Sequence, residues 1–445
     1  MEMKTQNESN NGEGNVGCLA SCRRRLCSAA ERVWRSVAGF AGKVAEIARD
    51  DPRRVAHSLK VGLALTLASV IYYVTPLFNG FGDSTMWSVI TVVFVMQFTV
   101  GGTLSKGLNR AVATLVAAFL AVGAHLAASL CGETGEPILL GVFVFLVASA
   151  ATFSRFIPEI KAKYDYGVII FILTYSLVAV SSYRVEDIFK FAQQRFTTIV
   201  IGVAACLSTS VFVFPIWAGE DLHKLAAANL DKLAEFLEGM ESEYLGVNSS
   251  SENLEGKAFL HAYKNVLNSK EREDILSMFA RWEPSHGKFI FRHPWDQYQK
   301  LGALCRQCAT TMEALASYVI TLTKCQPEAN PELCLKFRTA CAEISSHSAK
   351  ALRELSSAIQ TMIISSPTSN NMSVAIEVAN RLRGELSNDA TALLQVIHVP
   401  VIGSLPLDIV SQITKITESV DNLARLAGFK SPKKGQEGVI IEIVS

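Results

Sequence analysis

The chain has 445 residues, of which 49% are hydrophobic and only 19% are charged, and its mean hydropathy is +0.26. This is more apolar than an ordinary soluble domain. The formal net charge of +1 lacks the basic excess of nucleic-acid-binding proteins, so we expect no nucleic-acid partner.

Six windows in the first half of the chain contain no Asp, Glu, Lys or Arg. Each is 18 to 24 residues long, and they span residues 61–82, 84–105, 111–132, 137–154, 166–183 and 196–219. A helix needs about 20 apolar residues to cross a bilayer. The sequence therefore predicts an all-α membrane protein with six transmembrane helices in a lipid bilayer, and crossings free of carboxylates.

The charged segments predict the domain order. Residues 1–50 are polar and then basic, with no apolar signal segment, and the positive-inside rule keeps this arm in the cytosol. Residues 51–219 form the pore domain, which opens on the helix-start signal Asp50-Asp51-Pro52. Residues 220–430 have apolar residues at helical spacing and predict a cytosolic α-helical domain, followed by a flexible tail, 431–445.

No enzyme motif accompanies these segments. The loop 281–295 contains Trp282, His286, His293 and Trp295, but no zinc-binding helix or nucleophile elbow is present, so a packed loop between helices is expected. We expect neither catalysis nor a cofactor or metal.

Lysine and arginine residues lie at the ends of the predicted crossings. The stretch Gly101–Arg110 reads as a link between two crossings and contains Lys106 and Arg110 without an anion. Snorkelling to lipid headgroups would account for such cations. The alternative is a pore or vestibule, for which further candidates are Lys60, Trp87, Arg155 and Arg184.

Arg195 disobeys the positive-inside rule, because its link should lie outside the cell. The sequence around Arg195 is also similar to the sequence around Arg110: each arginine follows an amide side chain and precedes small or hydroxylated residues. Two arginines facing one cavity would suit carboxylates, and rings of Arg and Lys select anions. Passive anion conduction is therefore the first hypothesis, and a proton-coupled organic-acid exporter is the alternative.

Several short motifs occur in a fixed order: Asp51-Pro52-Arg53-Arg54, Lys60-Val-Gly-Leu-Ala-Leu65, Met86-Trp87-Ser-Val, Lys106-Gly-Leu-Asn-Arg110, Lys161-Ala-Lys-Tyr-Asp-Tyr-Gly167, Phe214-Pro-Ile-Trp-Ala-Gly219 and Trp282-Glu283-Pro284. They resemble the motifs of the plant aluminium-activated malate transporters. The resemblance implies a dimeric plant anion channel with malate and other anions as permeants. It also implies that Arg110 and Arg195, with Lys106 nearby, bind the anion. A multi-pass protein of the plasma membrane is expected, with the vacuolar membrane as the alternative.

Overall fold

A computed structural model describes residues 34–74, 85–183, 187–245, 258–289, 293–324, 331–364, 370–388 and 399–430. These residues are almost entirely helical and contain no β-strand, only isolated bridges between His286 and Phe289 and between Ile363 and Lys430. The prediction of an all-α chain is confirmed for this part. Arg184, one of the vestibule candidates, lies outside the described residues.

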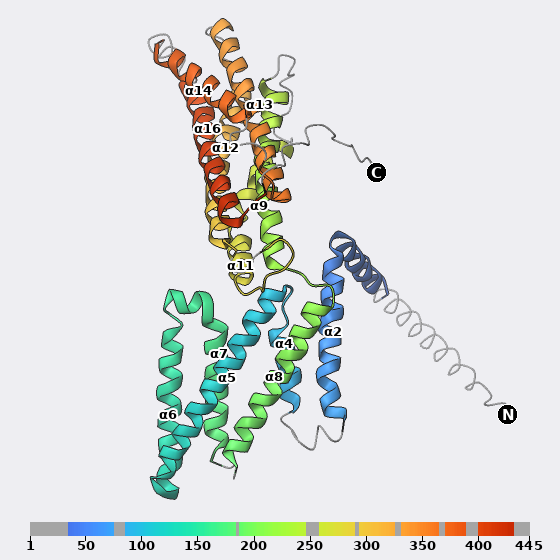
Figure 1. Cartoon of the computed structure of the whole chain (residues 1–445), viewed down its shortest axis with the longest axis vertical. Helices are drawn as coiled ribbons and strands as arrows, with labels where there is room; N and C mark the ends of the chain where they lie inside the picture. Colours follow the sequence, from blue (N-terminus) through green and yellow to red (C-terminus); the bar gives the residue numbers. More distant parts are fainter. Residues whose placement is uncertain are drawn as a thin grey trace, which may run out of the picture.

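The helices form two bodies stacked along the long axis (Figure 1). The first body consists of α2 (Pro52–Tyr73), α4 (Met86–Val95), α5 (Val100–Ser129), α6 (Gly132–Ser154), α7 (Pro158–Ser181) and α8 (Ile188–Phe212). The second body contains α9 (Ala218–Gly239) with a π-helical turn, Met240–Leu245, then Ala258–His261, α10 (Ala262–Leu267), α11 (Lys270–Ala280), α12 (Trp295–Lys324), α13 (Pro331–Thr361), α14 (Asn370–Asn388) and α16 (Val399–Ala427).

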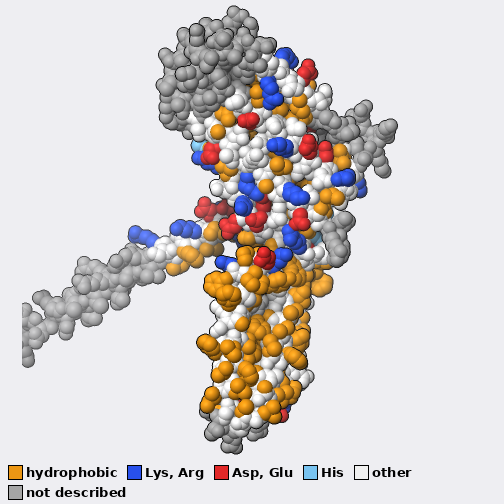
Figure 2. Space-filling view, turned by 90° about the vertical axis from the view of Figure 1, so that its left-hand side faces the viewer, with side chains coloured by type: hydrophobic (Ala, Val, Ile, Leu, Met, Phe, Trp, Pro, Cys, Tyr) orange, Lys and Arg blue, Asp and Glu red, His pale blue; other side chains and the backbone are white. Residues whose placement is uncertain are grey.

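Four helices of the first body are long and apolar enough to cross a membrane: Val100–Ser129, Gly135–Ser154, Pro158–Ser181 and Ile188–Phe212. Large hydrophobic side chains cover the outside of this body, whereas charged side chains are mixed over the second body (Figure 2). The first body is therefore the membrane-embedded part.

The remaining two helices of the first body are less apolar or shorter. Helix α2 carries Arg53, Arg54 and Lys60, and α4 has ten residues, about 15 Å, half of a hydrocarbon core. The predicted start of α2 is confirmed: Asp51 is the N-cap, its carboxylate accepts from the Arg53 amide at 3.1 Å, and Pro52 opens the helix.

The predicted link Gly101–Arg110 is wrong, because this stretch is the first part of the continuous helix α5. The chain breaks earlier, between Val95 and Val100. Thr99 caps α5 by accepting from the Gly102 amide at 3.2 Å, and the Val100 amide donates to the Ile216 carbonyl at 2.9 Å. The helix therefore begins about 15 Å before Arg110.

Small residues let the membrane helices approach closely. Ala64 and Ala68 of α2 pack with Val92 of α4 and Val203 of α8, and a second cluster joins α5 to α7 through Ala117, Ala121, Tyr175, Val178 and Ala179. Helices in a membrane associate through such small surfaces because lipid tails leave little hydrophobic driving force between them.

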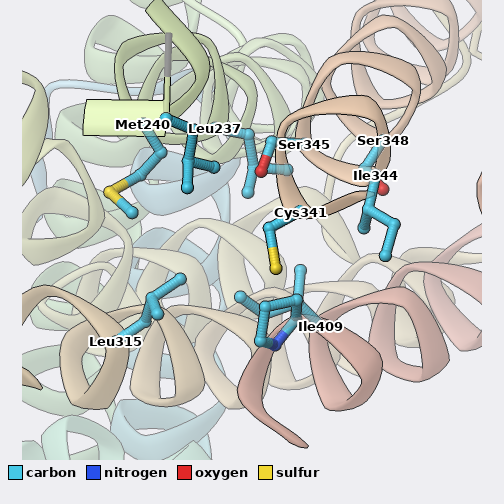
Figure 3. A pocket seen from close by; sticks show the side chains of 10 residues that line it. Leu237, Met240, Leu315, Cys341, Ile344, Ser345, Ser348 and Ile409 are labelled. Atoms are coloured by element: carbon cyan, nitrogen blue, oxygen red, sulfur yellow. The ribbon is translucent and has the colours of Figure 1, made fainter. Parts of the chain in front are cut away.

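The second body has its own core. A cluster of buried residues runs through α9, α12, α13 and α16, and includes Leu230, Leu301, Leu352 and Ile413. Figure 3 shows a small apolar cavity at its centre, between Leu237, Leu315, Cys341 and Ile409 among others. Its volume of about 20 Å³ suits roughly one water molecule, so this is a packing gap in a closed core.

Candidate functional site

Arg110 is a buried arginine inside the membrane body. Its side chain is 2% exposed, and it lies where α5 packs on α7 and α8. One guanidinium nitrogen donates to the Tyr166 hydroxyl at 3.4 Å, and Nε has no hydrogen-bond partner. Tyr166 comes from α7, beside Gly167, which faces Asn109. No carboxylate of the described residues lies within ion-pair distance of Arg110, so its charge stays uncompensated.

Arg195 is buried in an aromatic environment. Its guanidinium carbon lies 4.1 Å from the centroid of the Trp87 ring and 4.9 Å from that of Phe191. Its Nε also has no hydrogen-bond partner. The negative faces of aromatic rings attract a cation without neutralising it. The Trp87 ring therefore packs on the guanidinium of Arg195 and takes none of its N–H donors.

The two candidate lysines, Lys106 and Lys60, differ in their surroundings. Lys106 lies one helical turn before Arg110 on the same face of α5, with Nζ 5.5 Å from the Tyr166 ring centroid. Lys60 is 1% exposed and donates to the Phe214 carbonyl at 2.6 Å. Phe214 has a φ of 44°, which is unusual for a non-glycine residue, so Lys60 stabilises a strained link between α8 and α9. Lys106 therefore adds a positive charge next to Arg110, whereas the ammonium group of Lys60 is bound to a backbone carbonyl.

Arg155 is neutralised. Its guanidinium forms two hydrogen bonds with the Asp165 carboxylate, at 2.7 and 3.2 Å. Glu136, near the N-terminus of α6, lies 3.3 Å from His125 of α5. The expectation that the crossings contain no carboxylate is therefore wrong, because α6 and α7 begin before the uncharged windows do.

The depth of Arg195 also differs from the prediction. The window 196–219 placed it at the end of a crossing, but α8 begins at Ile188, two turns earlier. A side chain added at Gly107 of α5 would contact Val203 of α8, so these two residues lie at the same height along the helix axes. The helices are antiparallel (Figure 1), and Arg195 then lies roughly 7 Å further from the second body than Arg110.

Arg110 and Arg195 lie at different heights on two packed helices, α5 and α8. Side chains on a helix tilt toward its N-terminus, so Arg110 and Arg195 extend in opposite directions from antiparallel helices. They form successive cationic positions along the helix axes. Two buried hydroxyls have no hydrogen-bond partner among the described residues: that of Thr114, one turn after Arg110, and that of Ser88, next to Trp87 in the sequence.

Comparison with known proteins agrees with this arrangement. Residues 45–397 match the family model described as aluminium activated malate transporter. The chain is 60% identical to aluminum-activated malate transporter 1 of Triticum aestivum over 97% of this chain and 94% of that protein. It is 45% identical to aluminum-activated malate transporter 2 of Arabidopsis thaliana, over 87% of this chain and 78% of the relative.

The chain belongs to the aluminium-activated malate transporter family. It is thus a membrane transporter and not an enzyme, as the sequence predicts. The resemblance stated from short motifs is confirmed over most of the chain. Sequence reasoning singled out Arg110, Arg195 and Lys106, but not Tyr166 or Ser88. Both lie inside motifs that pointed to the family, and only folding brings Tyr166 to Arg110.

A buried carboxylate connects the second body of this transporter to its membrane helices. Glu283 accepts from the amides of Gly101 at 3.3 Å, Ala218 at 2.6 Å and Gly219 at 3.0 Å. These amides lie at the N-termini of α5 and α9, where unpaired N–H groups and the helix dipole favour an anion. Burial raises the pKa of Glu283, and these hydrogen bonds oppose that rise.

An aromatic cluster surrounds Glu283. His286 stacks on Trp217 with 3.8 Å between ring centroids, and its Nε2 lies 3.9 Å from the Glu283 carboxylate. The predicted packed loop is therefore found at 281–289. Since α5 carries Lys106 and Arg110, any movement of this loop acts on the helix with the uncompensated cations.

Proposed function

We propose that this chain is an anion channel that passes malate and other organic or inorganic anions passively across a plant membrane. Arg110, Arg195 and Lys106 form its anion-binding positions. The single observation that carries the proposal is that two arginines are buried in membrane helices with no carboxylate partner among the described residues. A buried guanidinium is costly unless something compensates it. A passing anion does so transiently.

The printed names of the relatives supply the substrate class. The wheat and Arabidopsis proteins are named malate transporters, and malate is a dianion. Moving a dianion across 100 mV changes its free energy by about 4.6 kcal/mol, so membrane voltage suffices to drive efflux from a negative cytosol.

The topology and assembly complete the proposal. Six crossings, formed by α2 and α4 to α8, leave the basic arm and the helical domain 220–430 in the cytosol. The family resemblance supports a homodimer, and we favour the plasma membrane over the vacuolar membrane. Arg155 and Lys60 take structural roles, since a carboxylate and a carbonyl already bind them.

The test is electrical recording with malate as the only permeant anion. The reversal potential should follow the malate gradient by about 29 mV per tenfold change, the value for a divalent ion. Arg110→Gln and Arg195→Gln should each reduce the current at least about tenfold, equivalent to about 1.4 kcal/mol. Arg425→Ala is the matched control, because Arg425 is exposed on α16 and bonds only Asn422. Wild-type current in either glutamine variant would contradict the proposal.

One observation favours the alternative of a proton-coupled exporter: His125 of α5 lies 3.3 Å from the carboxylate of Glu136 on α6, and chains of His, Asp and Glu form the proton relays of transporters. An exporter should move malate against its gradient when a pH gradient is imposed, and His125→Gln should abolish that flux. For a channel, the same variant leaves the reversal potential unchanged. Flux driven by pH alone would decide for the exporter.

A further inference from the structure

The arm before the first membrane helix is itself a helix. Residues 34–50 are α-helical and end directly before Asp51, the N-cap of α2. Its large side chains are exposed, with Trp34 at 73% and Phe40 at 69%. No part of the described chain covers them, although exposed aromatic residues on a helix need an apolar environment.

The arm separates its residues into two faces. At 100° per residue, one half of the helix surface collects every apolar side chain: Trp34, Val37, Ala38, Phe40, Ala41, Val44, Ala45, Ile47 and Ala48. The other half collects the polar residues and the two glycines: Arg35, Ser36, Gly39, Gly42, Lys43, Glu46, Arg49 and Asp50. Such complete segregation is typical of helices that lie in the interface of a membrane.

The orientation of the arm agrees with the position of the bilayer. In Figure 2 the Lys and Arg side chains of the arm lie on the side of the charged body, and its hydrophobic side chains face the apolar body. The arm meets α2 at the level of the ion pair between Arg53 and Asp221, 2.8 Å, which lies at the junction of the two bodies. This level is where lipid headgroups would surround the membrane helices.

We propose that residues 34–50 form an interfacial helix whose apolar face inserts into the leaflet next to the helical domain. Its occupant is lipid. The three cations of the described arm, Arg35, Lys43 and Arg49, exceed the two acids, Glu46 and Asp50, and so favour anionic headgroups. The helix fixes the start of α2 at headgroup level. This inference goes beyond anion transport, since it needs only that α2 to α8 are embedded in a membrane.

The test compares two labelled positions on opposite faces of the arm. Val44→Cys and Gly42→Cys lie about 160° apart. A side chain at Gly42 meets nothing within 4 Å, so that substitution is accepted sterically. The full chain, with its other reactive cysteines replaced by serine, is labelled with a polarity-sensitive dye. It is then reconstituted in vesicles of phosphatidylcholine and phosphatidylserine that carry bromine on the acyl chains.

Bromine should quench the dye at position 44 about threefold more strongly than the dye at position 42, because only the apolar face reaches the acyl chains. Equal quenching at both positions, or none at position 44, would overturn the proposal. So would energy transfer between labels at position 44 on two subunits without bromine quenching, which would show that a second copy covers this face. Malate current is not read in this experiment, so a failure of the channel proposal leaves it intact.

Discussion

Arg195 and Arg110 show two ways of burying a guanidinium without cancelling its charge. Arg195 is enclosed by the Trp87 and Phe191 rings, which attract a cation through their faces and take no N–H donor. Arg110 donates one long hydrogen bond to the Tyr166 hydroxyl. A carboxylate partner, as at Arg155, would leave neither charge nor donors for a substrate. The lack of such a partner distinguishes these residues from an ordinary buried ion pair.

The planar fork of Arg110 predicts a selectivity change. Arg110→Lys keeps the positive charge and loses the paired donors that bind both oxygens of a carboxylate. The permeability of malate relative to chloride should fall about fivefold to tenfold, the equivalent of roughly one hydrogen bond of ordinary net strength, while chloride current persists. Reversal potentials under mixed malate and chloride gradients measure this ratio.

Arg425→Lys, the same substitution at an exposed position of α16, is the matched control and should leave the ratio within about twofold. An unchanged ratio in Arg110→Lys would show that charge alone matters at this position.

At the scale of helices, glycines determine how closely α4 and α5 approach α8. A Cβ added at Gly202 would lie 2.8 Å from the Ser88 carbonyl oxygen and 2.9 Å from the Thr91 Cβ. Both are closer than real Cβ contacts, and one belongs to the backbone. Because the Arg195–Trp87 contact joins the same two helices, displacing α4 also displaces the aromatic ring from the guanidinium.

Gly202→Ala should therefore lower stability by about 1–3 kcal/mol, the usual cost of overpacking. The midpoint temperature of the detergent-solubilised protein, followed by size-exclusion chromatography, measures this change. Gly141→Ala on α6 is the control, since its added Cβ would meet nothing within 4 Å. Equal midpoints for the two variants would mean that α4 and α8 can separate freely.

Helix starts with local signals were predictable from the sequence, and those with distant partners were not. Asp51 and Pro52 begin α2 through contacts within three residues. The break before Val100 carries no Gly, Pro or charge between Met96 and Thr99. Its one local signal is the Thr99 cap, and its other contacts are to Ile216 and Glu283, more than a hundred residues away.

Contacts between residues far apart in the sequence also limited the prediction of the candidate anion site. Charges were read as ends of crossings, which misplaced Lys106 and Arg110 in a link. The family motifs still identified Arg110, but its neighbour Tyr166 on α7 could be recognised only from the packing of α5 on α7.

At the scale of the whole molecule, charged side chains connect the two bodies at three places. Glu283 joins α5 and α9, Arg53 pairs with Asp221, and Lys60 binds the link before α9. Each contact involves a charged side chain, and on the side of the helical domain burial raises the pKa of Glu283.

His223 and His293 predict acid sensitivity of the helical domain. Both rings lie against the Tyr298 hydroxyl, at 2.8 and 3.3 Å, and burial lowers both pKa values to about 4. In the unfolded chain a histidine titrates near pH 6.5. Between about pH 6.5 and pH 4 the unfolded state therefore binds more protons. Stability is constant above that window and falls as pH decreases through it, by up to about 3 kcal/mol for one histidine.

The raised pKa of Glu283 acts in the opposite sense, because its contribution is present at low pH and lost as pH rises. A comparison of variants removes this term, since Glu283 is common to all of them. His293→Phe should flatten the dependence of the midpoint temperature on pH between about pH 6.5 and pH 4, with Trp295 fluorescence as the probe because the two rings lie 4.5 Å apart. His261→Gln, at an exposed position, should keep the wild-type slope. A wild-type slope in His293→Phe would place the acid sensitivity outside the His223–Tyr298–His293 cluster and in the charged contacts between the bodies.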